Sequence, residues 1–278
     1  MQDLARATRI PPGSKVDLDA HPPDARLGLR GETTARERTA KRAKRMADLA
    51  TMLMAEHKRA VLVVLQGMDA SGKDGTVKHC LGGLNPMSVR VAGFKAPNST
   101  ELAHDFLWRI HQVLPQRGEI GIFNRSHYED VLVVRVHELV PKKLWQARFG
   151  HITGFEALLA EQGTIVLKYF LHITKKEQKE RLLEREKDPA TAWKLNPNDW
   201  KERDYWDEYT GAYEDAISRT AAKHAPWIVV PANAKWYRNL VIAESIVEAL
   251  RAHRKGWHRK LKEMAGEAKA SLAAYRKK

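Results

Sequence analysis

Residues 61–76 read VLVVLQGMDASGKDGT, and this stretch decides the fold. The apolar run at 61–65 predicts a buried strand, and the glycines that follow predict a tight turn opening into a helix. In that setting, glycines let backbone N–H groups approach an anion at a helix N-terminus, where Lys73 adds a positive charge. The spacing from Gly67 to Lys73 fits the G-x-x-x-x-G-K pattern of phosphate-binding loops. The alternative is an ordinary tight turn with a solvated lysine, and the combination of strand, loop and lysine disfavours it.

One position of this loop departs from the usual pattern. Asp74 follows Lys73 at the place where most such loops carry the serine or threonine that ligates magnesium. The metal must then be held elsewhere, and Asp69 inside the loop is the candidate ligand. We expect phosphate contacts from the other loop residues, namely Gly67, Ala70, Ser71, Gly72, Asp74, Gly75 and Thr76.

Composition restricts the class of protein. The chain has 278 residues, enough for a large core, and we find neither an apolar stretch of membrane-spanning length nor a signal peptide. Cys80 is the only cysteine, so no intrachain disulfide can form and the cytoplasm is the expected compartment. The formal net charge of +14 predicts a polyanionic partner. Composition alone leaves that partner open between nucleic acid, an acidic membrane face and a phosphate polymer.

Strand and helix signals alternate along the chain. Apolar runs predict strands at 61–65, 88–92, 121–124, 164–171 and 227–230. Helical spacing predicts helices at 34–58, 73–82, 100–114, 144–162, 175–187, 206–224 and 236–253. This alternation predicts βαβ units, and therefore an α/β fold of three layers in which helices cover both faces of a central parallel sheet.

A second polar cluster follows the third predicted strand, in the sequence IGIFNRSHYED at 120–130. Ligands bind at the carboxyl ends of strands in open parallel sheets, so this cluster should face the same crevice as the loop. Arg125 is suited to hold a phosphoryl group through two hydrogen bonds. Asn124 offers a neutral oxygen where phosphate-transfer enzymes often place a carboxylate, and Glu129 adds a carboxylate nearby. Capping of the next helix by Ser126 is a structural alternative that can hold at the same time.

A third cluster combines a basic helix with a segment rich in proline and tryptophan at about 175–205. Arg181 and Arg185 are four residues apart and share one helix face, so both can point at one anion. Such a segment is typical of a lid, which excludes water when it closes over phosphates. The alternative is a surface helix whose arginine–glutamate pairs are solvated. We divide the chain into an extended arm at 1–33, a main domain with this lid at 34–255, and a basic tail at 256–278.

Four motifs are more specific than a bare phosphate-binding loop: GMDASGKDGT at 67–76, GFKAPN at 93–98, FNRSHYEDVLVVRV at 123–136 and DPATAWKLNPND at 188–199. With them, the chain resembles the polyphosphate kinase type 2 family over roughly residues 12–255. Within that family it most resembles the class that phosphorylates nucleoside monophosphates as well as diphosphates. The resemblance implies a thymidylate-kinase-like P-loop kinase fold of three α/β/α layers, with a central parallel sheet and a helical lid.

The resemblance also implies an activity. Family members transfer phosphoryl groups between inorganic polyphosphate and nucleotides with Mg²⁺, or with Mn²⁺ in its place. We therefore expect reversible phosphorylation of AMP and ADP, and of guanine nucleotides, by a cytoplasmic homo-oligomer without a nucleic-acid or membrane partner. Asn124 and Glu129 resemble the monophosphate-using class, so Asp69 with Asn124 or Glu129 is the expected metal-binding set. The residues carried over as catalytic are Asp69, Lys73, Arg125 and Glu129.

The chemistry of such a substrate fits the basic residues of these motifs. A polyphosphate carries roughly one negative charge per unit, so it needs a long row of cations. The acceptor oxygen of a nucleotide phosphate is already ionised and needs no general base, so positioning and charge neutralisation dominate. The row of cations that we expect around the crevice consists of Lys73, Lys95, Arg125, Arg181, Arg185 and Lys194.

Two other classes of protein share part of this pattern. An ATP-dependent nucleoside monophosphate kinase of the thymidylate-kinase type has the loop and the lid, but it would not need so basic a crevice. A non-enzymatic nucleic-acid binder would fit the charge, but the chain lacks an aromatic and basic RNA-binding motif and would have no use for a lid. A comparison of polyphosphate with ATP as donor separates the first, and binding across a salt series tests the second.

Overall fold

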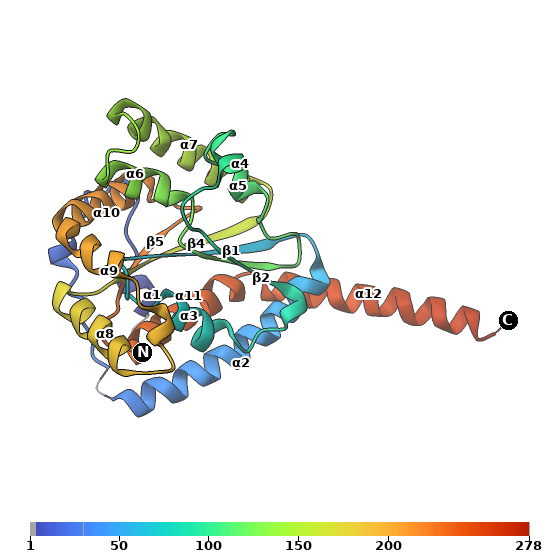
Figure 1. The fold of residues 1–278 in the computed structure, drawn as a ribbon. Helices are drawn as coiled ribbons and strands as arrows, with labels where there is room; N and C mark the ends of the chain where they lie inside the picture. The colour runs from blue at the N-terminus through green and yellow to red at the C-terminus, as the bar shows by residue number, and fades with distance from the viewer. Residues whose placement is uncertain (1–3, 30, 278) are drawn as a thin grey trace.

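The structure, a computed structural model, describes residues 4–29 and 31–277. Its centre is a five-stranded sheet with strand order β2-β3-β1-β4-β5, and every neighbouring pair is parallel. Helices lie on both faces (Figure 1), so the predicted α/β fold of three layers is confirmed. The strands are β1 Ala60–Gln66, β2 Val89–Gly93, β3 Ile120–Asn124, β4 Thr164–His172 and β5 Trp227–Pro231.

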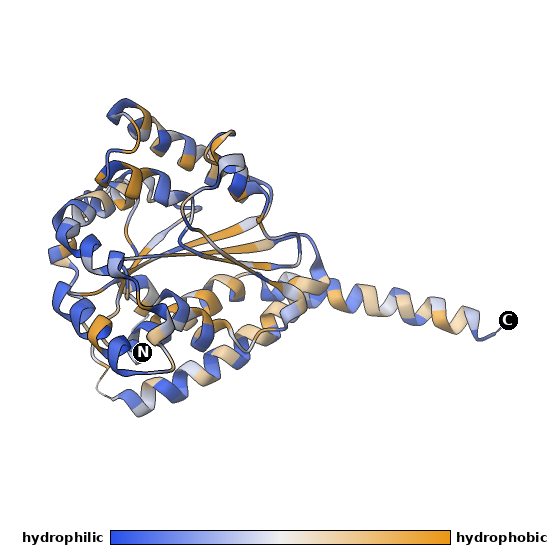
Figure 2. Ribbon diagram, viewed as in Figure 1, coloured by the Kyte–Doolittle hydropathy of each residue, from blue (hydrophilic) through white to orange (hydrophobic). Residues whose placement is uncertain are grey.

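The continuous apolar character of β1 follows from its position at the centre of the sheet. All of its residues are buried, because successive side chains of a strand point to opposite faces and both faces are covered here. Val61, Val63 and Leu65 pack against helices α2 (Glu32–Glu56) and α11 (Lys235–Arg251). Leu62 and Val64 point to the opposite face of the sheet and belong to a second apolar core, which α7 (Lys142–Glu161) and α10 (Trp206–Thr220) cover. In Figure 2 the orange of apolar residues accordingly covers much of the strands of the sheet.

The other helices are shorter, apart from the last. A π-helical turn at Val77–Leu81 continues α3, and 3₁₀ turns lie at Leu18–Ala20, Pro86–Ser88, His127–Val131, Ala192–Lys194 and Glu202–Tyr205. The remaining α-helices are α1 Leu4–Ala7, α3 Lys73–Thr76, α4 Ser99–Leu102, α5 Trp108–His111, α6 Val133–Val136, α8 Lys175–Lys187, α9 Pro197–Lys201 and α12 Arg254–Tyr275. No helix in the described part of the chain is long and apolar enough to cross a bilayer.

The helix predicted at 100–114 is wrong as a single element. The structure has two single-turn helices there, α4 and α5, separated by a break at 103–107. In the break, the Asp105 side chain accepts a hydrogen bond from the backbone N–H of Leu107 at 2.9 Å. Aspartate competes in this way with the helical hydrogen bonds, so the local turn prevails over the apolar spacing.

The described part of the predicted arm packs along the body. The Ile10 N–H donates to the Trp227 carbonyl at 2.9 Å, and the Val229 N–H donates to the Thr8 carbonyl at 2.9 Å. Arg9 thereby forms an antiparallel bridge with Ile228, on the outer side of β5, which is the last strand of the sheet in the described part of the chain. The arm thus closes one edge of the sheet, and residues 1–3 and 30 of the predicted segment lie outside the described residues.

The predicted basic tail forms most of helix α12. Figure 1 shows this helix projecting away from the body for most of its length. Along α12, all of which the structure describes, Trp257 is the buried residue, and Met264, Leu272 and Tyr275 are exposed.

A buried ion pair fixes the segment that follows β3. Lys168 on β4 donates to Glu156 on α7 at 2.6 Å and to the Tyr128 hydroxyl at 2.9 Å, and the hydroxyl donates to Glu156 at 2.9 Å. Both charged side chains are fully buried. Lys168 also donates to the Thr220 carbonyl at 2.8 Å, which connects α10 to the same network. Tyr128 lies between the candidate site residues Arg125 and Glu129, so the network holds their segment against the sheet.

We expect Lys168→Met to lower the free energy of unfolding by about 3–5 kcal/mol, because it leaves the Glu156 carboxylate buried without its cation. The double variant Lys168→Met/Glu156→Leu should recover at least half of that loss, because it removes both charges from the core. Urea denaturation followed by circular dichroism measures both. A loss below about 1 kcal/mol in the single variant would contradict this account of the network.

Candidate functional site

The predicted loop and strand end meet at one cleft. It has a volume of about 1820 Å³ and opens where β1 and β3 end. The residues that line it include most of the predicted site: Asp69, Ala70, Gly72, Lys73, Asp74, Gly75, Lys95, Asn124, Arg125, Glu129, Arg181, Arg185 and Lys194. Gly67, Ser71 and Thr76 are not among the lining residues.

Two positions of the loop must be glycine because other parts of the protein pack closely against them. Gly67 has a φ of +149°, and a Cβ there would lie 2.8 Å from the Leu171 carbonyl oxygen. Gly72 has a φ of +101°, and a Cβ there would overlap the guanidinium of Arg238. Larger residues are therefore excluded by backbone conformation and by space together. The glycines that predicted a phosphate loop are therefore also needed for its close packing against Leu171 and Arg238.

Of the loop residues outside the lining, Thr76 has a side-chain partner within the protein, whereas the buried Ser71 hydroxyl has no hydrogen-bond partner among the described residues. Ser71 is fully buried, and the Thr76 hydroxyl donates to the Gly72 carbonyl at 3.1 Å. The thiol of Cys80, on the π-helical turn, is buried and donates to the Asn239 carbonyl at 3.4 Å. Burial raises the pKa of this thiol to about 12, which makes it inert.

Lys73 crosses the loop beneath the cleft. Its ammonium donates to the carbonyls of Gly67 at 2.7 Å and Met68 at 3.1 Å, and the residue is 8% exposed. Burial, followed by the charge of the nearby Arg125, lowers the pKa of Lys73 to about 8 against the opposing effect of Asp69. The lysine therefore holds the loop together as well as supplying charge, and the charge is held at an energetic cost that a bound anion would relieve.

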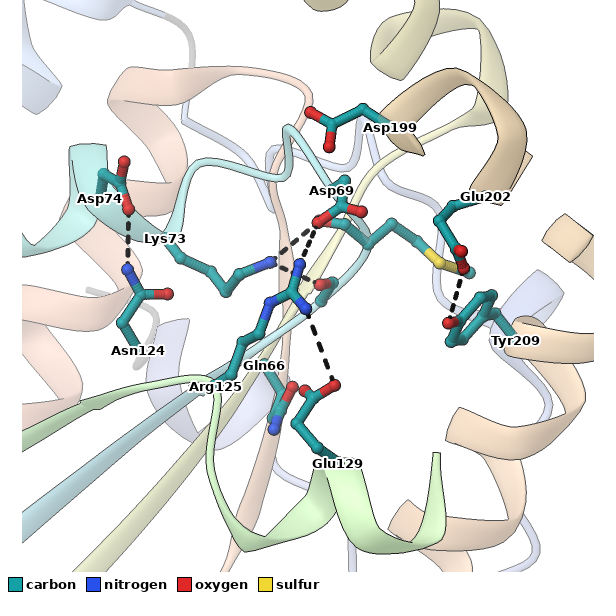
Figure 3. A network of polar contacts seen from close by, with 12 residues as sticks. Gln66, Asp69, Lys73, Asp74, Asn124, Arg125, Glu129, Asp199, Glu202 and Tyr209 are labelled. Atoms are coloured by element: carbon teal, nitrogen blue, oxygen red, sulfur yellow. Dashed lines mark hydrogen bonds and ion pairs between the residues drawn. The ribbon is translucent and has the colours of Figure 1, made fainter. Parts of the chain in front are cut away.

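Arg125 occupies the centre of the site. Figure 3 shows its guanidinium between the carboxylates of Asp69 and Glu129, at 2.5 Å and 3.9 Å. The backbone of Arg125 has a φ of +62°, in the left-handed region that non-glycine residues rarely adopt. Its N–H donates to the Leu65 carbonyl at 3.0 Å, which holds this turn against β1. Strain of this kind concentrates at functional sites, where the surrounding structure enforces it.

Glu129 lies behind this arginine. Burial raises the pKa of Glu129, and the charges of Arg125 and Lys73 act in the opposite direction. Ser126 caps the 3₁₀ turn that carries Glu129 by accepting a hydrogen bond from the Tyr128 N–H at 3.1 Å. Ser126 therefore has the capping role that we gave as the structural alternative, and Arg125 lies in the cleft at the same time.

Asn124 is hydrogen-bonded to the loop, and its predicted role as a metal ligand stays a prediction. Its amide donates to the Asp74 carboxylate at 2.7 Å, and Lys194 of the lid segment donates to the other oxygen of Asp74 at 2.6 Å. The hydrogen bond from Lys194, followed by the one from Asn124, keeps the pKa of Asp74 low despite partial burial. Asp74 thus links the loop, the end of β3 and the lid segment in this conformation.

The two arginines of α8 have different partners within the protein. Arg185 lines the cleft and donates to Asp199 at 3.1 Å. Arg181 is buried, and its guanidinium donates to backbone carbonyls of the loop, including that of Ala70 at 2.9 Å. Lys95 is exposed at the cleft wall. A direct contact of Arg181 with phosphate stays a prediction, but its donors have partners inside the protein.

The expected metal ligands are divided between two pairs. Asp69 is paired with Arg125, whereas Asn124 is bonded to Asp74. Among the described residues there is no group of three or more histidine, cysteine, aspartate or glutamate side chains that could hold a metal ion. Magnesium commonly takes only one or two carboxylates and completes its shell with water and substrate phosphates. The donor set around Asp69 therefore fits a metal that enters with the substrate.

Sequence reasoning missed two residues of the cleft. Asp199 lies near Asp69 in Figure 3, and burial followed by the charge of Asp69 raises the pKa of Asp199. The lid motif at 188–199 contained this residue, but its proximity to the loop depends on the tertiary fold. Arg238 on α11 lies under the loop with its NH1 3.4 Å from the Ser71 carbonyl, and no local pattern indicates it.

The cleft also has an apolar wall on the side of β2. Phe94 packs edge-to-face on Phe123, and the nearby Asp130 is held by Arg148 at 3.2 Å. The wall includes the exposed side chains of Leu102 and Leu139. The apolar residues that line it are Phe94, Ala96, Pro97, Leu102, Val133, Val134, Leu139 and Val140.

A phosphate loop after a central strand, an arginine at the neighbouring strand end and a basic helical segment above both place the chain in the class of P-loop kinases. The family model described as polyphosphate kinase 2 matches residues 30–257, and the chain belongs to this family. The resemblance predicted from the motifs is thereby confirmed.

Similar proteins have names that agree with the family. The chain is 49% identical over 243 residues to the AMP/ADP-polyphosphate phosphotransferase of Meiothermus ruber. The aligned residues cover 87% of this chain and 91% of the relative. It is 41% identical to the ADP-polyphosphate phosphotransferase of Rhodopseudomonas palustris, over 90% of this chain and 91% of the relative. The crystal structure of polyphosphate kinase 2 from Arthrobacter aurescens is similar with a TM-score of 0.87 and 39% identity, and covers 90% of each chain.

The lowered pKa of Lys73 predicts a pH-dependent affinity for phosphate chains. Above about pH 8 the free protein loses the ammonium charge, so affinity for inorganic triphosphate should fall as the pH rises through that value. Bound phosphate raises the lysine pKa again, so binding near pH 8 should take up protons. Titration calorimetry in buffers of different ionisation enthalpy measures both effects.

Lys73→Arg is the matched control, because a guanidinium stays charged throughout this range. Relative to that variant, the wild-type affinity should decline between about pH 7 and about pH 9.5. Parallel pH trends in the two proteins would show that Lys73 is not the group that titrates.

Proposed function

We propose that this chain transfers phosphoryl groups reversibly from inorganic polyphosphate to nucleoside mono- and diphosphates. AMP and ADP are the expected acceptors, with guanine nucleotides as further acceptors and Mg²⁺ or Mn²⁺ as the metal. The observation that carries the proposal is the gathering of cations from separate elements around one cleft. Lys73 comes from the loop, Arg125 from the end of β3, and Arg185 and Lys194 from the lid segment. A donor with charge along its whole length needs such a row.

The apolar wall gives the acceptor a place in the same cleft. The flat faces of a nucleobase suit apolar contacts, and Leu102 and Leu139 are exposed large apolar side chains that line the cleft. Arg109 lies behind the wall and donates to the Lys95 carbonyl at 2.9 Å, which fixes the 93–98 segment. We therefore place the base on the β2 side and the phosphates over the loop. The relatives named for AMP and ADP support nucleotides as the acceptors.

The residues of the chain supply binding and charge neutralisation. Arg125 would exchange its contact with Asp69 for the transferring phosphoryl group, because a guanidinium can bind a phosphate through two hydrogen bonds as it binds a carboxylate. Lys73 would hold the outer phosphates from below. The 175–205 segment, acting as a lid, would exclude water from the phosphoryl group. When bound, the metal neutralises charge on the donor and acceptor phosphates, and Asp69 is the residue placed to hold it, with Glu129 or Asn124 as the further candidates.

The cytoplasm is the proposed compartment, because the chain has one cysteine and that cysteine is buried as a free thiol. Assembly into a homo-oligomer stays a prediction, which light scattering coupled to size-exclusion chromatography would test. The division into arm, main domain and tail is likewise proposed from the sequence.

Product analysis separates the proposed function from its two alternatives. Incubation with Mg²⁺, polyphosphate and AMP should yield ADP and ATP, and EDTA should remove the activity. Lys73→Ala should lose at least about a hundredfold in turnover, on the order of 3 kcal/mol of transition-state stabilisation. Anion-exchange chromatography of the nucleotides measures each. A preference for ATP as donor would indicate an ATP-dependent monophosphate kinase, and salt-sensitive RNA binding without nucleotide products would indicate a nucleic-acid binder.

Glu129 is expected to matter more for the shorter acceptor. A monophosphate must sit further into the cleft than a diphosphate to bring its terminal phosphate to the donor, and a carboxylate behind Arg125 can support it there through metal or water. Glu129→Gln should therefore lower the rate ratio of AMP to ADP phosphorylation about tenfold, or about 1.4 kcal/mol. Asp130→Asn is the matched control, since Asp130 contacts Arg148 and should affect both acceptors equally. An unchanged ratio in Glu129→Gln would place the chain outside the monophosphate-using class.

A further inference from the structure

Side chains of the lid helix hold the outer side of the phosphate loop. Gln178 on α8 donates to the Asp69 carbonyl at 3.0 Å. One turn further, Arg181 donates to the carbonyls of Ala70 at 2.9 Å and Ser71 at 3.0 Å. Three successive carbonyls of the loop are thus held by one helix that lies more than one hundred residues away in sequence.

The remaining donors of Arg181 have partners as well. Its NH2 group donates to the carbonyls of Ala232 at 2.6 Å and Asn233 at 2.9 Å, in the turn between β5 and α11. Its Nε donates to Glu177 at 2.7 Å. A guanidinium has five N–H donors, and these five acceptors account for all of them. With the residue 5% exposed, no donor is left for a phosphate.

This arrangement sets the direction of the loop amides. In a trans peptide the N–H points opposite to the preceding carbonyl. Carbonyls of Asp69 and Ser71 that face α8 therefore direct the N–H groups of Ala70 and Gly72 to the other side, and both residues line the cleft. Ala70 has a φ of +59°, which an alanine adopts only under restraint.

We infer that Arg181 is a positioning residue that holds the phosphate loop in its anion-binding conformation, and that it does not contact phosphate itself. The turn at Ala232 and Asn233 serves as the fixed point for this restraint. Asn233 is in turn held by the arm, because its N–H donates to the Pro23 carbonyl at 3.1 Å. It also accepts a hydrogen bond from the N–H of Thr174, the N-cap residue of α8, at 3.1 Å. This role of Arg181 rests on the proposed function, whereas the hydrogen bonds that restrain the loop are present without substrate.

Hydrogen–deuterium exchange of the substrate-free protein tests the restraint directly. Arg181→Lys keeps the charge and retains three N–H donors instead of five, so it cannot hold all the carbonyls. Peptides covering 66–76 should exchange at least about tenfold faster in this variant, while peptides from the centre of α11 stay unchanged. Arg185→Lys, one turn along the same helix, should leave loop exchange unchanged and raise the KM for polyphosphate.

Activity gives a second readout. In Arg181→Lys, kcat should fall about a hundredfold, whereas the KM for polyphosphate should change less than about threefold. Unchanged loop exchange with a raised KM would show that Arg181 binds phosphate directly, and faster exchange throughout the protein would show a general loss of stability. Either result overturns the inference.

A milder variant covers the case in which Arg181→Lys does not fold. Gln178→Ala removes the donor to one loop carbonyl only, and loop exchange should rise about threefold. Unchanged exchange in Gln178→Ala would then overturn the restraint by α8. Exchange is measured without nucleotide or polyphosphate. The restraint of the loop by α8 can therefore be tested even if the proposed phosphoryl transfer is not observed.

Discussion

The carbonyl oxygens of the phosphate loop need donors on the side away from the cleft, and this requirement links the loop to most of the molecule. A loop whose amides face an anion must satisfy its carbonyls elsewhere, because buried backbone groups without partners are costly. Lys73 provides for the first two carbonyls, Gln178 for the third, and Arg181 for the next two. Through Arg181 the loop is connected to the turn after β5, and through Asn233 to the arm. The anion-binding conformation is therefore a property of the assembled fold.

Charge in the cleft is balanced in a way that a bound polyanion would reverse. Arg125 is neutralised by Asp69 and Glu129, and Lys194 by Asp74. The pairs Arg125–Asp69 and Lys194–Asp74 join segments that are distant in sequence, so both restrain the cleft in its present form. Phosphates that displace the carboxylates would release Asp69 for a metal and separate Lys194 from Asp74, while α8 keeps its hydrogen bonds to the loop. Substrate binding and rearrangement of the site are thus coupled through the same ion pairs.

The sequence predicted what depends on local pattern. The strand at β1, the glycine loop and the strand-end Arg125 follow from hydrophobicity, spacing and the position of ligands in parallel sheets, and the structure has them together. The partner of Arg181 could not be predicted in this way. Helical spacing places Arg181 on the same helix face as Arg185. Whether its guanidinium contacts a ligand or a backbone carbonyl depends on which distant segments of the chain pack against that face. Arg238 gave no signal because only the folded α11 brings it under Gly72.

The arm has a consequence for how the chain tolerates shortening. Residues 8–10 cover the outer edge of β5, where the central sheet would otherwise end in unpaired backbone groups. Removing them would expose a fully buried apolar strand to pairing with another molecule, so truncated chains should lose solubility before they lose the fold. Helix α12 is different, because most of it projects from the body without burying side chains. A fusion partner or surface attachment is accordingly better tolerated after α12 than in place of the arm.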